Sequence, residues 1–407
     1  MDHDNLDTQM DAVDLVDLLD HRGDLPSAER FARRALAADP RNCLALNILG
    51  VVHYLTGRES EAMDILRRTK SDHPGDPNAY YSLAKVLSDG GRSEQSLMVL
   101  EELFAKVALN SPGFERIFSY ASSLCEQVQR TLAEQKHAGA CGAVDAFRRT
   151  LESRTGYPIV VFLDDMPPQM GASLNSAFTS GKGRHVIRCN RSFPATFLQP
   201  LVASQLMRIE LAYEVRAAGK ARSPVSTPAH IRFMQSIFRP RPRQMERLRT
   251  PGFSDETILR AAAEGLHNLM RDLFNVPPEL IAESRVRERL PILSAAQFLC
   301  GGYILRRAPN PSQTLSRPNF TPLALLRVWL ALDCVRARFH DSLFGGTTAF
   351  ASAYTHTEVH PLASRLWHRW ETAARPIQPG DEYCLIDEFA GIVGLRQAYD
   401  WIVAPTT

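Results

Sequence analysis

Histidines near the C-terminal end are the first candidates for chemistry, because their spacing would suit a metal ion. His356 and His360 are four residues apart, which would place two imidazoles on one face of a helix, and His368 follows two turns later. Pro361 comes directly after His360, so the two histidines can instead belong to different elements. A metal site therefore competes here with ordinary polar or partly buried histidines.

A second candidate lies on a helix that the apolar spacing predicts over residues 200–218. Two strand-like segments, 159–163 and 185–188, precede it and flank the segment Asn175-Ser-Ala-Phe178. This order of parts resembles the catalytic core of gluzincin metallopeptidases, in which an Asn-Ala-Phe-like segment precedes an edge strand and the next helix carries HExxH. The resemblance covers roughly residues 156–221 and implies a small sheet packed with helices.

The residues at the motif position are not zinc ligands. Where the resemblance places HExxH, the chain has Ser204-Gln205-Leu206-Met207-Arg208. A zinc peptidase needs two imidazoles four apart and a glutamate that takes a proton from the metal-bound water. Ser204 and Gln205 supply neither group, and Arg208 places a permanent cation where the zinc would lie. The resemblance therefore implies a pseudoenzyme without catalytic residues, metal or cofactor.

In the gluzincin pattern a later helix brings the third, acidic ligand. The resemblance makes Asp272 or Glu264 the counterpart of that ligand and the expected ion-pair partner of Arg208. Two other interpretations stay open. The helix can be an ordinary amphipathic core helix with Gln205 and Arg208 at the solvent. Alternatively, the protein is an active zinc hydrolase, whose candidate ligands are His267, His356, His360 and an acid, Asp272 or Glu358.

A basic segment is a candidate for binding an acidic partner or a phosphate backbone. Residues 232–249 contain six arginines and one acid. Pro240 and Pro242 keep the middle of the segment extended, which predicts an exposed basic loop. The loop carries a single aromatic residue, Phe238, which is too few for a platform on which bases stack, so nucleic acid is not the preferred partner. The arginines assigned to this loop are Arg239, Arg241, Arg243 and Arg247.

The elements that must position such groups begin with a repeat in the first quarter of the chain. Gly23, Gly57 and Gly91 are 34 residues apart, and each interval holds two apolar helical stretches. This pattern resembles the tetratricopeptide repeat, in which pairs of helices stack into a solenoid. In such repeats the first helix of each pair lines a groove that takes a peptide. The groove is expected to expose Asn47, Val51, Tyr54, Asn78, Tyr81 and Lys85.

Length and composition set the remaining bounds. The 407 residues suffice for two or three domains, and 44% apolar and 23% charged residues are ordinary for a globular protein. The net charge of +2 does not by itself indicate nucleic acid. The chain has no apolar run of the length that a signal peptide or a membrane span needs, and its seven cysteines form no close pair, so we expect a cytoplasmic protein with free thiols.

Together these patterns predict a mainly α protein, with an N-terminal α-solenoid followed by an α+β metallopeptidase-like domain that has a small sheet and many helices. We expect helical repeats over residues 1–112, capping or linking helices over 113–153, and the metallopeptidase-like domain over 154–403. The expected function is a scaffold or sensor that binds another protein or a peptide, with no membrane partner. The alternatives are an active zinc hydrolase and a regulatory module whose basic loop binds nucleic acid or an acidic partner.

Overall fold

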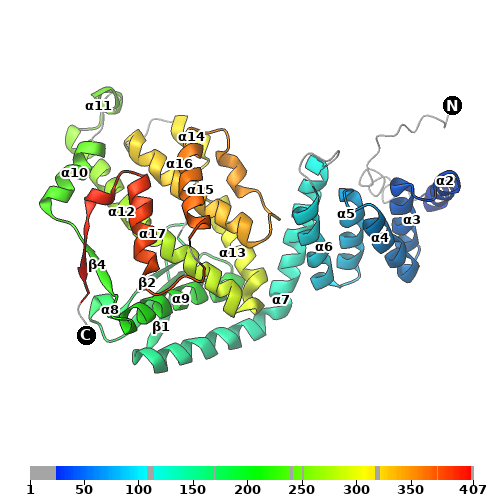
Figure 1. Cartoon of the computed structure of the whole chain (residues 1–407), viewed down its shortest axis with the longest axis horizontal. Helices are drawn as coiled ribbons and strands as arrows, with labels where there is room; N and C mark the ends of the chain where they lie inside the picture. Colours follow the sequence, from blue (N-terminus) through cyan, green and yellow to red (C-terminus); the bar gives the residue numbers. More distant parts are fainter. Residues whose placement is uncertain are drawn as a thin grey trace. The chain divides into compact units, whose positions relative to one another are not determined.

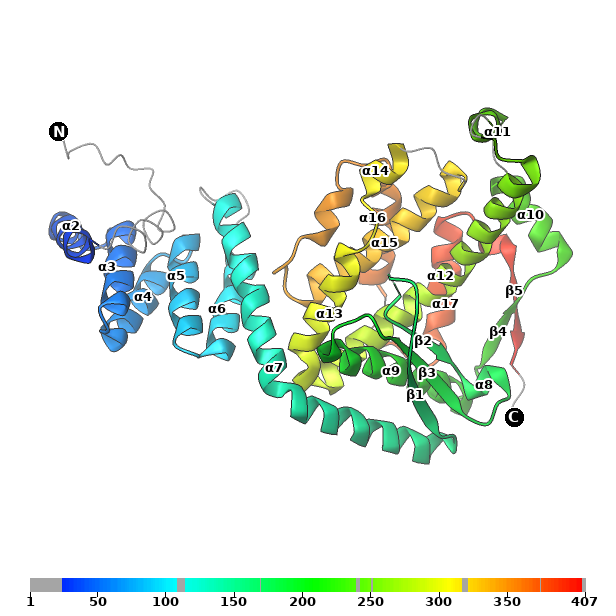
Figure 2. The same cartoon turned by 180° about the vertical axis from the view of Figure 1, so that it is seen from behind.

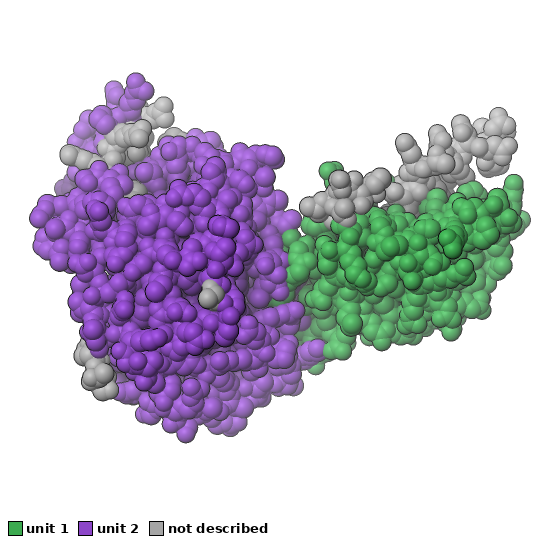
Figure 3. All heavy atoms as spheres, in the orientation of Figure 1, with its two compact units in different colours: residues 1–135, 344–348 green, residues 136–343, 349–407 purple. Residues whose placement is uncertain are grey.

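Most of the described residues are helical, and the strands among them form two small sheets (Figure 1). The computed structural model describes residues 24–107, 114–168, 170–238, 242–249, 252–316, 321–373 and 375–404. The chain divides into two compact units, which Figure 3 distinguishes by colour. Unit 1 comprises residues 1–135 and 344–348, and unit 2 comprises residues 136–343 and 349–407. The division therefore falls inside one long helix, α7.

The described part of unit 1 is mainly helical, and its helices follow one another in chain order (Figure 2). They are α2 (Leu25–Ala38), α3 (Cys43–Leu55), α4 (Glu59–Asp72), α5 (Pro77–Asp89), α6 (Ser93–Lys106) and the beginning of α7 (Phe114–Thr155). This arrangement confirms the tetratricopeptide-like repeats. In the segment 113–153, expected to hold capping or linking helices, residues 114–153 belong to the single helix α7, and residue 113 lies outside the described residues.

Glycine and small residues allow the two helices of a repeat to turn and to pack closely. Gly57 and Gly91 end the turns after α3 and α5 with φ angles of 80° and 72°, which residues with a side chain rarely adopt. Ala62 and Ser96 hold equivalent positions in α4 and α6 and are fully buried. The Ser96 hydroxyl donates to the carbonyl of Ala84 at 2.7 Å, so the polar member of the pair is satisfied.

Gly50 marks the closest approach of α3 to α4, and a side chain there is expected to destabilise unit 1. A Cβ atom at this position would lie 2.7 Å from the Leu66 side chain, which is fully buried. Gly50→Val should therefore cost about 1–3 kcal/mol through overpacking. Hydrogen exchange of the α3 and α4 amides measures the loss. Gly75→Val is the matched control, because nothing lies within 4 Å of a Cβ there; equal effects of the two changes would contradict the prediction.

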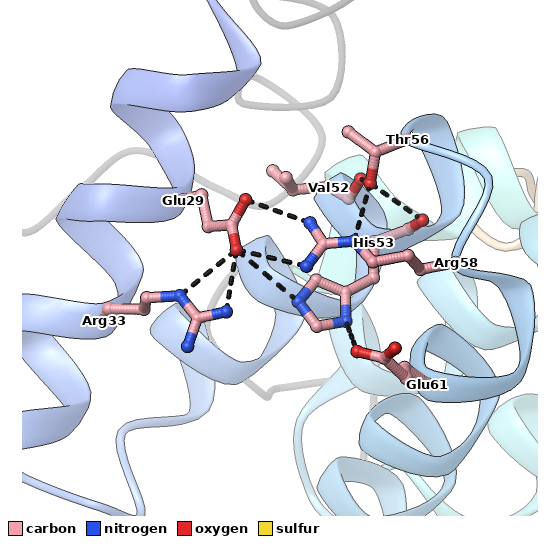
Figure 4. Close-up of polar contacts among 7 residues, drawn as sticks. All are labelled: Glu29, Arg33, Val52, His53, Thr56, Arg58 and Glu61. Atoms are coloured by element: carbon pink, nitrogen blue, oxygen red, sulfur yellow. Dashed lines mark hydrogen bonds and ion pairs between the residues drawn. The ribbon is translucent and has the colours of Figure 1, made fainter.

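Ion pairs of the same kind join successive repeats. Arg58 follows Gly57 and binds Glu29 of α2 at 2.9 Å, and Arg92, one period later, pairs with Glu59 of α4, which does not hold the repeat position of Glu29. Figure 4 shows the first of these ion pairs, in which Glu29 also accepts a hydrogen bond from Arg33. His53 lies beside it, 4% exposed, with Nδ1 3.1 Å from Glu61, and burial lowers its pKa. These contacts hold α2, α3 and α4 together.

Unit 2 contains a small three-stranded sheet, of which the sequence predicts two strands. Its strands are β1 (Ile159–Asp164), β2 (Ala172–Asn175) and β3 (His185–Asn190), in the order β1-β3-β2. β1 runs parallel to β3 and β2 runs antiparallel to it. Helix α9 (Leu198–Ala217) packs against β2 and β3, so both expected strands and the expected helix are confirmed.

Long helices build the rest of unit 2 around one apolar core. Buried side chains of α12, α15, α16 and α17, such as Leu273, Val335, Leu366 and Phe389, form this core. A two-stranded antiparallel ribbon pairs β4 (Arg222–Val225) with β5 (Asp400–Val403). The helices are α8 (Ala177–Ser180), α10 (Pro228–Phe238), α11 (Pro242–Arg249), α12 (Asp255–Arg289), α13 (Ser294–Arg306), α14 (Pro311–Ser316), α15 (Leu323–Leu343), α16 (His360–Glu371) and α17 (Asp381–Ile392).

The prediction of an extended basic loop is wrong for part of the segment. Arg243 and Arg247 lie in the helix α11, and Arg243 is exposed there. Pro242 begins this helix, a position where its fixed φ and missing N–H cost nothing. Arg239 and Arg241 lie outside the described residues, as does the side chain of Arg247. Within the described ranges, no helix has the length and apolar character that crossing a membrane requires.

Candidate functional sites

The helix α9 carries the residues that stand at the motif position. Ser204 and Gln205 are buried, with 5% and 7% of their surfaces exposed, and Arg208 is partly buried one turn later. The interpretation that puts Gln205 and Arg208 at the solvent is therefore wrong. Ser204 and Arg208 belong to a polar layer between α9, α12, α13 and α15, which we call the α9–α12 layer.

Arg208 does not pair with either of the acids expected for it. Its Nη2 donates to the Oδ1 atom of Asn275 on α12. Asp272 instead accepts from the indole nitrogen of Trp329 at 2.6 Å, and Glu264 lies exposed on α12. The expected ion pair of Arg208 with Asp272 or Glu264 is thus wrong, because those residues lie on turns of α12 that do not face Arg208.

The acids that face α9 are Glu279 and Glu283, which are four residues apart on α12. Burial lowers the pKa of Arg208, while the charge of Glu279 raises it. Burial raises the pKa of Glu283, and hydrogen bonds from Gln297 and Ser204 oppose that rise. Gln297 Nε2 donates to Glu283 Oε2 at 2.7 Å. Of the two motif positions, Ser204 therefore faces Glu283 and Arg208 faces Glu279.

Arg336 of α15 also belongs to the layer and contacts three of its carboxylates. Its Nε lies 3.2 Å from Glu279, its Nη1 3.0 Å from Asp333, and its Nη2 3.8 Å from Asp272. Burial opposes the charge of Arg336, but the three carboxylates outweigh it and raise the pKa of the guanidinium. Burial raises the pKa of Asp333. The layer thus places two guanidinium groups near several carboxylates of α12 and α15.

The proposed zinc ligands of the hydrolase alternative do not come together. Among the residues that the structure describes, no group of three His, Cys, Asp or Glu side chains could hold a metal ion. His356 and His368 are exposed, and His360 begins α16 with Nδ1 3.4 Å from Arg338. His267 is exposed on α12, and Glu358 pairs with Arg327.

Sequence reasoning missed Glu279 and Glu283. One signal was available, because two glutamates four apart follow Pro277 and Pro278 directly and so share a helix face if the helix continues through the prolines. The prolines lie inside α12, and the helix does continue. Asp333 and Arg336 are three residues apart and pair within α15, but nothing local indicated that Arg336 also contacts Glu279, which lies more than fifty positions away.

A second candidate site is the face formed by the first helices of the repeats in unit 1. We call it the first-helix face and define it by Tyr54 of α3, Asn78, Tyr81 and Lys85 of α5, and Tyr120 of α7. All five side chains are partly or fully exposed. The rings of Tyr81 and Tyr120 lie 6.2 Å apart between centroids, and their planes are inclined by 50°. Lys85 Nζ lies 2.6 Å from each carboxylate oxygen of Asp89.

Two of the residues expected in the groove are not part of this face. Asn47 and Val51 are buried, with 1% and 6% of their surfaces exposed. The reason is that α3 is apolar around most of its circumference and is buried on nearly every side. Asn47 donates from Nδ2 to the sulfur of Cys43 at 3.5 Å within this packing. The expectation that these two residues contact a peptide is corrected accordingly.

Comparison with known proteins bears only on the repeats that carry the first-helix face. A family model of tetratricopeptide-like repeats, described as "Anaphase-promoting complex, cyclosome, subunit 3", matches residues 21–103. No curated protein and no solved structure matches the chain. The match covers much less than half of the chain and supports tetratricopeptide-like repeats at the N-terminal end, the class of repeat that commonly binds other proteins.

Proposed function

We propose that the protein is a scaffold or sensor that binds another protein or a peptide through the first-helix face, and that unit 2 is a metallopeptidase-like domain without a catalytic zinc. The observation that carries the first part is the repeat architecture, with partly exposed tyrosines on three successive first helices. Tyrosines supply large contact areas at little cost in side-chain entropy and are enriched among the residues that dominate binding energy.

The α9–α12 layer supports the second part of the proposal. In a zinc peptidase, two imidazoles four apart and an acid from another helix would meet at one ion. Here Ser204 and Arg208 keep that spacing and face two acids of α12, but neither can bind zinc. The guanidinium of Arg208 would repel a dication by several kcal/mol at short range even at an effective dielectric of about 20. Arg208, bonded to Asn275, and Arg336, paired with acids of α12 and α15, serve the packing of unit 2 in place of catalysis.

Substitution of two face tyrosines is expected to abolish partner binding. Full-length protein carrying Tyr54→Ala and Tyr81→Ala should capture at least about tenfold less partner than the unaltered protein. Each truncation removes a contact whose loss is expected to cost more than ~1 kcal/mol of binding free energy. Quantitative mass spectrometry of proteins captured from a lysate measures this. Met98→Ala is the control, because Met98 lies on the second helix α6 and is 68% exposed. Undiminished capture by the tyrosine variant would remove the first-helix face from the proposal.

Metal analysis distinguishes the proposed scaffold from the zinc hydrolase alternative. We expect purified full-length protein to contain less than about one-tenth of a zinc ion per chain, because a structural or catalytic site would retain about one. Elemental analysis after dialysis against zinc-free buffer gives the value. About one zinc per chain, lost on substitution of His356 by alanine, would instead support an enzyme with a site built from that histidine.

A further inference from the structure

We infer that the outer edge of β1 in unit 2 binds an extended segment of another protein as an added strand, and that this segment has apolar residues in its middle and acidic residues at its ends. The edge shares no residue with the first-helix face, so this binding site goes beyond the proposed function and does not depend on it. The backbone groups of β1, the exposed side chains beside them and the charge of the neighbouring strand carry the inference.

The strand β1 has backbone hydrogen-bonding groups on two sides, and β3 uses only one of them. β1 lies at one end of the strand order β1-β3-β2. At the start of the ladder His185 N–H donates to the carbonyl of Pro158, at 2.9 Å. At its end Arg191 N–H donates to the carbonyl of Asp164, also at 2.9 Å. Because backbone groups alternate between the two sides of a strand, the even-numbered residues of β1 face β3 and the odd-numbered residues face outward.

Side chains occupy the outward groups at both ends of the strand. The amide of Ile159 donates to Glu152 of α7 at 2.8 Å, and its carbonyl accepts from Arg148 at 3.5 Å. The carbonyl of Leu163 accepts from the Arg191 side chain at 3.2 Å. These contacts agree with the outward direction of the odd-numbered residues and leave the middle of the edge between them.

The middle of the edge is unpaired and apolar. The N–H and C=O groups of Val161 and the N–H group of Leu163 have no hydrogen-bond partner among the residues that the structure describes. Proteins usually protect such an edge with a charged side chain, a proline or a covering element. Here Phe162 and Leu163 lie on opposite faces of the strand and are 47% and 51% exposed. Unpaired backbone groups beside exposed apolar side chains suit the addition of an extended peptide to the sheet.

The charge of the neighbouring strand favours acidic residues in the added segment. Residues 181–191, which include β3, contain four Lys and Arg residues and no acid. Lys182 and Arg184 are exposed, and neither side chain has an ion pair within the described ranges. Arg188, the neighbour of Phe162 on β3, is 56% exposed and lies 3.6 Å from Asp164. A segment with acidic ends is attracted to these cations, whereas a basic segment is repelled.

Hydrogen exchange and calorimetry on the full-length protein test the inference. In the free protein the amides of Val161 and Leu163 should exchange at least about tenfold faster than those of Val160 and Phe162, which bond to β3. The synthetic heptapeptide Asp-Val-Thr-Val-Thr-Val-Asp should bind saturably and slow the exchange of the Val161 and Leu163 amides. The same peptide with lysine at both ends should bind at least about fivefold more weakly.

A proline at the edge separates backbone pairing from side-chain contact. Val161→Pro removes an outward N–H and should weaken heptapeptide binding by about tenfold or more. The sheet should tolerate this change, because proline is found on edge strands where the N–H faces solvent. Val161→Ala is the matched control, since it keeps the N–H, and should retain most of the binding. Tyr54→Ala with Tyr81→Ala, in unit 1, should leave the binding unchanged.

N-methylation gives the same test from the side of the peptide. Only every second N–H of an added strand faces β1, so methylation of the odd-numbered or of the even-numbered peptide residues should have unequal effects. One form should lose about tenfold or more in affinity and the other should retain most of it. Should Val161→Pro lose helical circular dichroism, this pair of peptides decides the question.

Several results would overturn the inference. They are absence of heptapeptide binding, equal binding to a folded Val161→Pro variant, equal effects of the two methylated forms, and equal binding of the lysine peptide. Loss of binding in the tyrosine variant would also overturn it, because the peptide would then occupy the first-helix face, and the proposed function would stand.

Discussion

Replacing Arg336 with leucine is expected to destabilise unit 2 by about 3–5 kcal/mol. The change leaves the carboxylates of Glu279, Asp333 and Asp272 without their shared cation in the interior of the α9–α12 layer. Burial already raises the pKa of Asp333 while the guanidinium is present, so removal of Arg336 should increase the penalty further. Hydrogen exchange of the α12 and α15 amides measures the loss in unit 2 by itself.

A surface arginine and a second substitution serve as controls for that result. Arg188→Leu removes an exposed pair with Asp164, 3.6 Å apart, and should cost less than about 1 kcal/mol. Adding Glu279→Gln to Arg336→Leu should recover part of the stability, because one of the stranded carboxylates becomes neutral. If Arg336→Leu costs no more than Arg188→Leu, the α9–α12 layer does not stabilise the unit as we describe.

Restoring imidazoles to α9 is expected to create a zinc site. The double substitution Ser204→His with Arg208→His removes the cation and places two nitrogen ligands four residues apart, opposite Glu279. We expect uptake of about one zinc ion per chain, compared with almost none in the unaltered protein. At zinc concentrations about 100-fold above the dissociation constant, binding should stabilise unit 2 by about 2.7 kcal/mol. Elemental analysis and thermal unfolding with and without zinc give both values.

The control for the zinc result removes the same groups without adding ligands. Ser204→Ala with Arg208→Ala also eliminates the cation, but it offers only acids to the metal and should take up no stoichiometric zinc. A folded histidine variant that fails to bind zinc would contradict the metallopeptidase-like assignment of the α9–α12 layer. Equal uptake by the alanine variant would show that the acids alone hold the ion.

The solenoid could be predicted because its determinants are local and recur. Gly57 and Gly91 mark turns that need a positive φ, and Ala62 marks the crossing of two helices, so each residue type reports on its own surroundings. The strands around Ile159 and His185 were also visible, because β-branched and apolar residues cluster there between turn residues.

The contacts within the α9–α12 layer could not be predicted from the sequence in the same detail. The spacing of Ser204 and Arg208 showed which face of α9 mattered, but the facing turn of α12 depends on how two helices pack. The choice of Asp272 therefore missed Asn275, the hydrogen-bond partner of Arg208, by one turn, and Glu279 and Glu283 were overlooked. Arg336 joins its neighbour Asp333 to Glu279 and Asp272, which lie far from it in sequence, and no local pattern reveals those two contacts.

Exposure along single helices was the other source of error. Helical spacing placed Asn47 and Val51 with Tyr54, yet α3 is enclosed on more sides than its position in a repeat suggests. Similarly, the alternation of proline and arginine around Pro242 indicated an extended segment, whereas a proline in that position also begins a helix. Tyr120 was missed because the repeat is out of phase after α6.

The ion pairs of Arg58 and Arg92 would allow the solenoid to be lengthened by whole repeats. Each arginine reaches back to a glutamate of the preceding second helix, and the two lie one period apart. If a second copy of residues 58–91 were spliced in after Gly91, its first arginine would meet Glu59, and Arg92 would meet the copied glutamate. Every arginine would then keep a glutamate partner, so duplication of a whole repeat would preserve this ion pair at each new junction.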